Sequence, residues 1–374
     1  MMETKPIGLY VHIPFCIRKC NYCDFCSVAV SKDKIKSYTD SLISEIESYK
    51  CESKRRINTV FFGGGTPSVL DIDDFERIVS AIREVFEICE GAEFSAEVNP
   101  ATVTVEKAHS FKRLGVNRVS IGLQSIHENE LKILGRIHNY EDFLNTFRIL
   151  RDGGMRNINV DLMYGIPEQT EESFSQTLAA VAALDPEHIS AYGLIVEEGT
   201  PFYRMRHELD LPSEDDEYNM YLSAVSALGE AGYSHYEISN YAKPGFECRH
   251  NLKYWRDEEY IGVGLAAHSY LDGKRYSNTT EFDEYFEGFG LKYRKEESVT
   301  DGLDKFEYAM LALRLSEGLS LLEYRKIFGE EFAKGKEKLL REYVNAGYMD
   351  VVDGRIKFTD KGFYVSNTIL AELL

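Results

Sequence analysis

The first half of the chain repeats one pattern six times: a short apolar run typical of a buried strand is followed by a segment with helical periodicity. Strands that are apolar on both faces and alternate with helices are typical of a parallel sheet with crossover connections. Six units are fewer than the eight of a closed barrel. The sequence therefore predicts an α/β fold, a partial (β/α)6 barrel, whose strands are Ile7–Pro14, Asn58–Gly64, Glu93–Pro100, Arg118–Ser125, Asn157–Gly165 and His188–Val196.

The second half of the chain is less regular. Two extra strands are predicted at His235–Ala242 and Tyr260–Tyr270, with an aromatic-rich loop between them. From about Leu303, helical segments precede a hairpin at Met349–Phe358 and a last helix at Asp360–Leu373, a pattern that favours a small winged-helix-like domain. We expect three parts: the barrel in residues 1–232, a strand and loop extension in 233–302, and the C-terminal domain in 303–374.

The charge balance excludes two classes of partner. Among 374 residues, 43 are Lys or Arg and 62 are Asp or Glu, which gives a net charge of −19. Nucleic-acid binders and proteins that bind anionic membranes need a basic face, so neither class is expected. No apolar run is long enough to span a membrane, and the first residues lack the apolar core of a signal peptide. We therefore predict a cytoplasmic protein.

Four of the seven cysteines lie within eleven residues, directly after the first predicted strand. In a reducing compartment such a group indicates a metal or cluster site. The CxxxCxxC spacing of Cys16, Cys20 and Cys23 suits a [4Fe–4S] cluster, in which three protein ligands leave one iron open. A zinc knuckle with Cys26 as the fourth ligand is the alternative. Spacing alone also leaves open a shifted CxxCxxC ligand set, Cys20, Cys23 and Cys26.

Polar residues follow several of the predicted strands. In parallel barrels the active site lies at the carboxyl ends of the strands, where these residues would meet. The run Gly63–Pro67 lets bare backbone approach a ligand closely, and carboxyl, amide and guanidinium groups come from Glu97, Gln124, Asp161 and Arg136. The sequence thus predicts one ligand site beside the cysteines.

Several motifs together resemble the radical S-adenosylmethionine (SAM) superfamily and, within it, the coproporphyrinogen III oxidase-like branch. They are YVHIPFC (10–16), FFGGGTPS (61–68), EVNP (97–100), IGLQS (121–125), GRIH (135–138), DLMYGIPEQT (161–170) and TDKGFYVSNTIL (359–370). The resemblance implies that Cys16, Cys20 and Cys23 bind the cluster and that SAM chelates the fourth iron. It further implies SAM contacts at Tyr10, Tyr22, Gly64, Gly65, Thr66, Glu97, Gln124, Arg136 and Asp161.

Two families of this branch must be separated: a decarboxylating coproporphyrinogen III dehydrogenase and the HemW-type haem chaperones. The dehydrogenase typically continues its motif as CxxxCxxCxC, whereas Phe25 stands at that last position here. It also carries a substantial extension before its cysteines, for which this sequence has no room. The segment from His250 to Trp255 reads HNxxYW, which matches a haem-associated motif of the chaperones and contains the single Trp.

The resemblance implies haem contacts at His250, Tyr254 and Trp255. Imidazole and phenol groups can ligate haem iron, and aromatic rings can cover the macrocycle. The alternative is that His250 and Trp255 only pack and hydrogen-bond in their loop. Arg249 is a candidate partner of a haem propionate, and Cys248 is either a second soft ligand or an uninvolved thiol.

We interpret the sequence as a haem chaperone with a [4Fe–4S] cluster and SAM. The expected partners are haem and acceptor haemoproteins, and the sequence leaves open peripheral contact with membrane-bound acceptors, a homodimer and radical chemistry. The second hypothesis is oxygen-independent coproporphyrinogen III dehydrogenase. A third is a cluster-bearing binding protein without a haem role.

Overall fold

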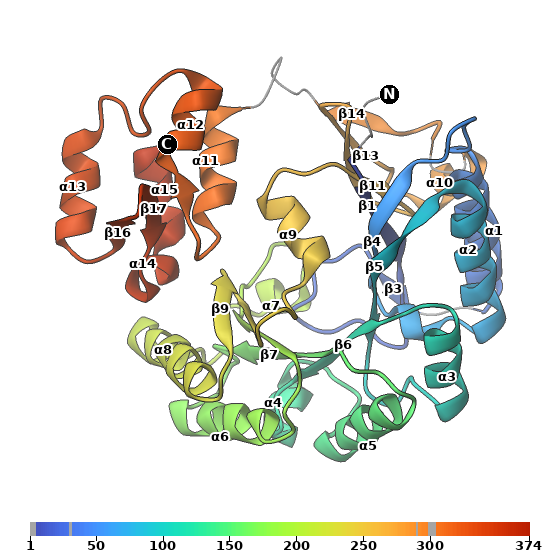
Figure 1. The fold of residues 1–374 in the computed structure, drawn as a ribbon. Helices are drawn as coiled ribbons and strands as arrows, with labels where there is room; N and C mark the ends of the chain where they lie inside the picture. The colour runs from blue at the N-terminus through green and yellow to red at the C-terminus, as the bar shows by residue number, and fades with distance from the viewer. Residues whose placement is uncertain (1–4, 30–31, 289–290, 298–303) are drawn as a thin grey trace.

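The computed structural model describes residues 5–29, 32–288, 291–297 and 304–374, and its centre is one long mixed sheet (Figure 1). Seven neighbouring strands, from β11 to β8, run parallel, and antiparallel strands extend both ends. In spatial order the described strands are β14 (Lys295–Glu297), β13 (Lys274–Ser277), β12 (His268–Leu271), β11 (Tyr260–Val263), β1 (Ile7–Ile13), β4 (Arg56–Gly64), β5 (Glu87–Val98), β6 (Arg118–Gln124), β7 (Ile158–Tyr164), β8 (His188–Gly193), β10 (Asn240–Ala242) and β9 (Ser234–Glu237).

Helices cover the outer face of the curved sheet, as expected for strand–helix–strand units (Figure 1). The predicted partial barrel is therefore confirmed, and β11 adds a seventh parallel strand beside β1. Several helices begin at a side chain that caps the first turn, such as Asn139 and Ser213. The helices of this part are α1 (Lys32–Glu47), α2 (Ile72–Val85), α3 (Val105–Arg113), α4 (Glu128–Ile133), α5 (Tyr140–Asp152), α6 (Glu171–Ala182), α7 (Pro201–Arg204), α8 (Glu214–Glu230) and α10 (Phe282–Gly288).

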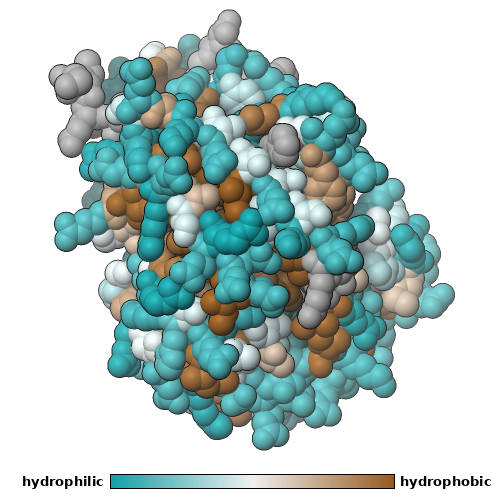
Figure 2. Space-filling view, turned by 90° about the vertical axis from the view of Figure 1, so that its right-hand side faces the viewer, coloured by the Kyte–Doolittle hydropathy of each residue, from teal (hydrophilic) through white to brown (hydrophobic). Residues whose placement is uncertain are grey.

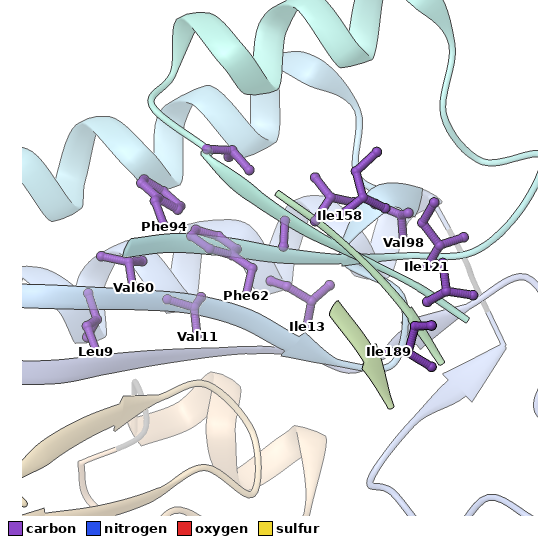
Figure 3. Close-up of a cluster of buried hydrophobic side chains, with 14 of the residues drawn as sticks. Leu9, Val11, Ile13, Val60, Phe62, Phe94, Val98, Ile121, Ile158 and Ile189 are labelled. Carbon is purple, nitrogen blue, oxygen red and sulfur yellow. The ribbon is translucent and has the colours of Figure 1, made fainter. Parts of the chain in front are cut away.

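The core lies between the sheet and the helices (Figure 3). Alternate residues of each strand, for example Leu9, Val11 and Phe62, are buried against the helices. The residues between them face the interior of the barrel. The prediction that the strands are apolar on both faces is wrong for this inner face, which carries buried polar side chains: Thr59, Glu93, Ser95, Ser120, Asn159 and Ser190. The partly closed barrel therefore has an interior lined with polar side chains and not a second apolar core.

The extension differs from the prediction in three places. The segment expected as one strand at His235–Ala242 is the hairpin β9–β10, and the segment expected at Tyr260–Tyr270 is two antiparallel strands, β11 and β12. The loop expected between them contains helix α9 (Arg249–Trp255), which lies inside the open side of the barrel (Figure 1). The boundary expected at 232/233 stays a prediction, and the one at 302/303 falls outside the described residues.

The C-terminal part forms a small helical unit with a wing, as predicted. Hairpin β16–β17 turns at Asp353 and Gly354, both with positive φ, the conformation that two-residue hairpin turns require. The last predicted helix is interrupted at Val365, and the helix that precedes the hairpin begins only at Glu337. The elements are α11 (Lys305–Leu313), β15 (Leu319–Ser320), α12 (Leu321–Phe328), α13 (Glu337–Asn345), β16 (Met349–Val352), β17 (Arg355–Phe358), α14 (Asp360–Tyr364) and α15 (Ser366–Leu373).

This unit contacts the barrel directly. The Tyr221 hydroxyl on α8 donates to the carbonyl oxygen of Asp360 at 3.0 Å, and Ser316 N donates to the carbonyl oxygen of Tyr236 at 3.1 Å. On the face that carries α1, α2 and α10, hydrophobic residues form small areas separated by hydrophilic ones (Figure 2). No helix within the described ranges is long and apolar enough to cross a membrane.

A buried carboxylate joins α1 to the extension. Glu45 is fully buried and accepts hydrogen bonds from Gly264 N at 2.8 Å, from Asn278 at 2.7 Å and from the Tyr285 hydroxyl at 2.7 Å. The Arg294 guanidinium lies 3.1 Å from the same carboxylate. Burial penalises the charged form of the Glu45 carboxylate. The hydrogen bonds and the Arg294 cation offset that cost, so the fold depends on these partners.

We expect Arg294→Met to lower the free energy of unfolding by about 3–5 kcal/mol, since it leaves a buried carboxylate without its cation. The double variant Glu45→Gln/Arg294→Met should recover part of that loss. Arg113→Met is the control, because Arg113 pairs with Glu76 on the exposed surface. Urea unfolding measures all three, and equal effects of Arg294→Met and Arg113→Met would contradict the role given to Glu45.

Candidate functional site

A cavity of about 480 Å³ lies at the carboxyl ends of the parallel strands. It is lined by residues from the cysteine loop and from the ends of five strands or the loops that follow them. The structure thus brings together all three predicted cluster ligands and eight of the nine predicted SAM contacts: Cys16, Cys20, Cys23, Tyr22, Gly64, Gly65, Thr66, Glu97, Gln124, Arg136 and Asp161. The ninth, Tyr10, lines a cavity of about 320 Å³ that shares Glu97 and Asp161 with the first.

Two of the three thiols accept hydrogen bonds from residues outside the cysteine loop. Cys16 ends the short strand β2 (Phe15–Cys16), which pairs with β3 (Val28–Ala29), and its sulfur accepts a hydrogen bond from the Thr66 hydroxyl at 3.6 Å. The sulfur of Cys20 accepts one from Arg136 Nη1 at 3.5 Å. Burial raises the pKa of Cys23 to about 11. All three thiols line the cavity, and those of Cys16 and Cys20 lie beside a donor that can stabilise a cluster thiolate.

The donor set fits a cluster better than a single ion. In the described part of the chain, no three His, Cys, Asp or Glu side chains stand close enough to bind one metal ion, as a zinc knuckle requires. Ligands of a cube bind separate irons and can stand farther apart. Cys26 lies outside the lining of the cavity, and its carbonyl oxygen accepts a hydrogen bond from His12 Nε2 at 2.8 Å.

The glycine run is required by close packing under the cysteine loop. A Cβ at Gly64, whose φ is +108°, would lie 2.5 Å from the His12 ring, and one at Gly65 would lie 2.7 Å from the carbonyl oxygen of Phe15. Gly64 N donates to Glu97 Oε2 at 3.1 Å. The run therefore brings β4 against the cysteine loop and orients a carboxyl group in the cavity.

Two carboxyl groups face the cavity from β5 and β7. Burial, together with the nearby Asp161, raises the pKa of Glu97 to about 8. Burial also raises the pKa of Asp161, although its oxygens accept hydrogen bonds from Ser120 at 2.8 Å and Asn159 at 2.7 Å. Such groups suit a ligand that offers hydroxyl groups or positive charge.

Arg136 is oriented by the neighbouring strand ends. Its Nη2 donates to Asn99 Oδ1 at 2.6 Å and also to the carbonyl oxygen of Gly122. Gln124, in a left-handed conformation with φ of +74°, accepts a hydrogen bond from the Tyr192 hydroxyl at 2.8 Å. These contacts hold the Arg136 guanidinium and the Gln124 amide beside the cavity, where both can donate hydrogen bonds to a carboxylate ligand.

The predicted haem residues lie on α9. His250 is 1% exposed, and its two ring nitrogens are hydrogen-bonded to Thr59 Oγ1 and to the Tyr254 hydroxyl, each at 2.8 Å. Its ring stacks on Phe61 with centroids 5.2 Å apart, and burial lowers its pKa to about 3. Trp255 instead faces the C-terminal unit, where the Arg314 guanidinium lies 5.8 Å from its ring centroid.

Glu93 is a site residue that the sequence analysis missed. Its carboxylate accepts hydrogen bonds from Arg249 N at 2.9 Å, from His250 N at 3.0 Å and from the Cys248 thiol at 3.6 Å. It thereby satisfies free N–H groups in the first turn of α9. Burial raises the pKa of Cys248 to about 12, so this buried thiol is a hydrogen-bond donor. The available signal was strand alternation, which places Glu93 and Glu97 on one face of β5.

Family models match two parts of the chain. A model of the radical SAM superfamily matches residues 10–181, and a model of the HemN C-terminal domain matches residues 305–365.

Curated relatives match nearly the whole chain. Proteins named heme chaperone HemW from Lactococcus lactis, Bacillus subtilis and Escherichia coli are 35%, 32% and 34% identical to it. These matches cover 100%, 98% and 99% of this chain and 98% of each relative. Among solved structures, coproporphyrinogen III oxidase (HemN) from Escherichia coli, described as a radical SAM enzyme, is similar with a TM-score of 0.85 and 25% identity. The match covers 98% of this chain and 90% of that one.

The raised pKa of Glu97 predicts a pH-dependent stability. Because the folded state binds a proton more tightly than the unfolded state, the contribution of Glu97 is present below pH 4.5 and is lost as the pH rises toward 8. Each pKa unit corresponds to about 1.4 kcal/mol. In the ligand-free protein, Glu97→Gln should therefore lose less stability than the wild type between pH 5 and pH 8. Urea unfolding at both pH values measures this, with Glu90→Gln, at an exposed position of β5, as the control.

The contacts of Glu93 predict that its removal loosens α9. Glu93→Ala leaves buried N–H groups without an acceptor and should cost roughly 1–3 kcal/mol of stability. Trp255 is the single Trp and ends α9, so its fluorescence should change at a lower urea concentration than the far-UV circular dichroism does. Glu90→Ala should leave the two transitions coincident, and coincident transitions in Glu93→Ala would refute the capping role.

Proposed function

Because the chain belongs to the HemW family of radical SAM proteins, we propose that it is a haem chaperone that binds haem and transfers it to acceptor haemoproteins in the cytoplasm. The observation that carries this proposal is the identity of 32–35% to three proteins named heme chaperone HemW over almost their full lengths. The geometry of the cysteine cavity is consistent with the cofactors that such a protein would hold.

In this proposal Cys16, Cys20 and Cys23 bind a [4Fe–4S] cluster, and SAM occupies the adjoining cavity. When bound, a cluster with an open iron supplies a chelation site for the amino and carboxylate groups of SAM and a source of one electron. The chain itself orients the ligand: Arg136 offers donors to a carboxylate, Glu97 and Asp161 accept from hydroxyl groups, and the backbone of Gly64–Thr66, which lines the cavity, permits close approach. Tyr10, Tyr22 and Gln124 complete the proposed set.

His250, Tyr254 and Trp255 are our proposed haem contacts on α9. In the described conformation His250 is buried and both ring nitrogens are engaged, so iron ligation requires α9 to move. Such a movement would break the His250 contacts with Thr59 and Glu93. The structure therefore supports a closed state of this segment, and we propose that haem binding at α9 opens it.

The second candidate is oxygen-independent coproporphyrinogen III dehydrogenase. The observation in its favour is the similarity to the HemN structure across nearly the whole chain. An anaerobic assay with SAM and a reductant that detects vinyl-group formation on coproporphyrinogen III separates the two. We expect no vinyl product.

Peripheral contact with membrane-bound acceptors stays a prediction, which vesicle flotation tests. A homodimer also stays a prediction, which sedimentation tests.

We predict that the anaerobically reconstituted chain binds haem saturably, near one haem per chain. His250→Ala should weaken binding at least tenfold, because it removes the proposed ligand, whereas His109→Ala, at an exposed position on α3, should not. Absorbance titration measures the affinity. Equal and unsaturable binding by all three proteins would mean non-specific adsorption and would refute the chaperone proposal. Saturable binding that His250→Ala leaves unchanged would refute only the site on α9.

A further inference from the structure

Four large apolar side chains are exposed around the mouth of the cysteine cavity. Ile17 and Phe25 on the cysteine loop are 51% and 64% exposed, Ile137 after β6 is 55% exposed, and Ile195 after β8 is 67% exposed. We call these four residues the mouth rim. Single exposed apolar residues are ordinary on a protein surface. Here, however, four exposed apolar residues from three separate loops gather at one opening, which the ordinary exposure of single residues does not explain.

The four residues surround connected space. Phe25 and Ile195 line the cavity of about 480 Å³. Ile17 and Ile137 line an adjoining hollow that shares Cys20 and Arg136, among others, with that cavity. Folding does not bury the rim, although each residue adjoins a cavity suited to a ligand. An apolar ligand that lies across the opening would remove these side chains from water, which is favourable.

Two cations stand beside this rim in a strongly acidic protein. Arg18 and Lys19 are exposed, both line the cavity, and Lys19 Nζ donates to the carbonyl oxygen of Phe25 at 3.0 Å. Asp24 and Glu197 line the same cavity, so the mouth carries charges of both signs, and Arg18 and Lys19 offer exposed cationic partners to an anionic group there. The combination of apolar contacts with two cations suits a flat apolar molecule that carries carboxylates at one edge.

We propose that the mouth rim binds one face of a metalloporphyrin, with the propionates directed to Arg18 and Lys19. The inference rests on the proposed function and adds contacts to those proposed on α9, whose Asn251 lines the cavity of about 320 Å³ together with Phe25. Haem has the required chemistry, since its macrocycle is flat and apolar and its two propionates are anionic. The rim is accessible in the described conformation, whereas His250 on α9 is not. The mouth can therefore take up haem without rearrangement of the fold.

The apolar part of the proposal is tested with Phe25→Ser/Ile195→Ser in the full-length, anaerobically reconstituted protein. We expect the Kd for haem, measured by absorbance titration, to rise at least tenfold. Leu322→Ser/Ile327→Ser is the matched control, because it removes two exposed apolar residues from α12 of the C-terminal unit. Unchanged circular dichroism and Trp255 fluorescence show that each variant is folded.

The electrostatic part is tested with Arg18→Glu/Lys19→Glu. This variant should weaken haem binding at least tenfold at low salt, and the difference from wild type should shrink as ionic strength rises. Arg325→Glu/Lys326→Glu on α12 makes the same change of charge at exposed positions of the C-terminal unit and should leave the Kd unchanged.

The outcomes separate this inference from the proposed function. If wild-type protein binds no haem saturably, the chaperone proposal fails and the rim proposal fails with it. If wild-type protein binds haem and the rim variants bind it equally well, only the rim proposal is overturned. Unchanged haem affinity with slower transfer to apomyoglobin, used as the acceptor, would also overturn it and would assign the rim to contact with a protein.

Discussion

The alternation of side chains along the parallel strands is the constraint on which the structure depends. Residues such as Leu9, Val11 and Phe62 point outward and form the core with the helices, so the intervening residues must point into the barrel. The barrel is only partly closed, and its interior is polar. Buried polar groups there need partners, and the strands supply them to one another, as Ser120 and Asn159 do for Asp161.

Strand β5 links the two ends of this interior. Glu97, near its carboxyl end, accepts from Gly64 N beside the cysteine cavity, while Glu93 accepts from the first turn of α9. Four residues of a strand span about 13 Å. Tyr10 lies between these regions, since it lines the cavity of about 320 Å³ with Glu97 and its ring centroid is 6.4 Å from that of His250. The cofactor cavity and the HNxxYW helix therefore share one polar interior.

The burial of α9 changes how its motif must be understood. A histidine, a tyrosine and a tryptophan within six residues predict a flat aromatic contact surface. In the fold, His250 and Tyr254 hydrogen-bond to each other and Trp255 packs toward the C-terminal unit. The exposed apolar residues of the mouth rim lie on the cysteine loop and on the loops after α4 and β8. In our two proposals, haem has one accessible surface at the mouth rim and one buried surface on α9, and exchange between them would require α9 to move.

Sequence patterns were sufficient to predict the six strand–helix units, the wing hairpin and the grouping of the cysteines with Gly64, Glu97, Gln124, Arg136 and Asp161. These features depend on local periodicity and on the rule that parallel strands end at one edge. Three features follow only from the packing of the folded chain: β11 joins the parallel strands, the HNxxYW segment is a helix inside the barrel, and Glu93 caps it. Those outcomes depend on contacts between residues far apart in the chain, such as the 157 positions that separate Glu93 from His250. Local sequence patterns carry no information about such partners, because burial and hydrogen bonding are decided only when distant segments pack together.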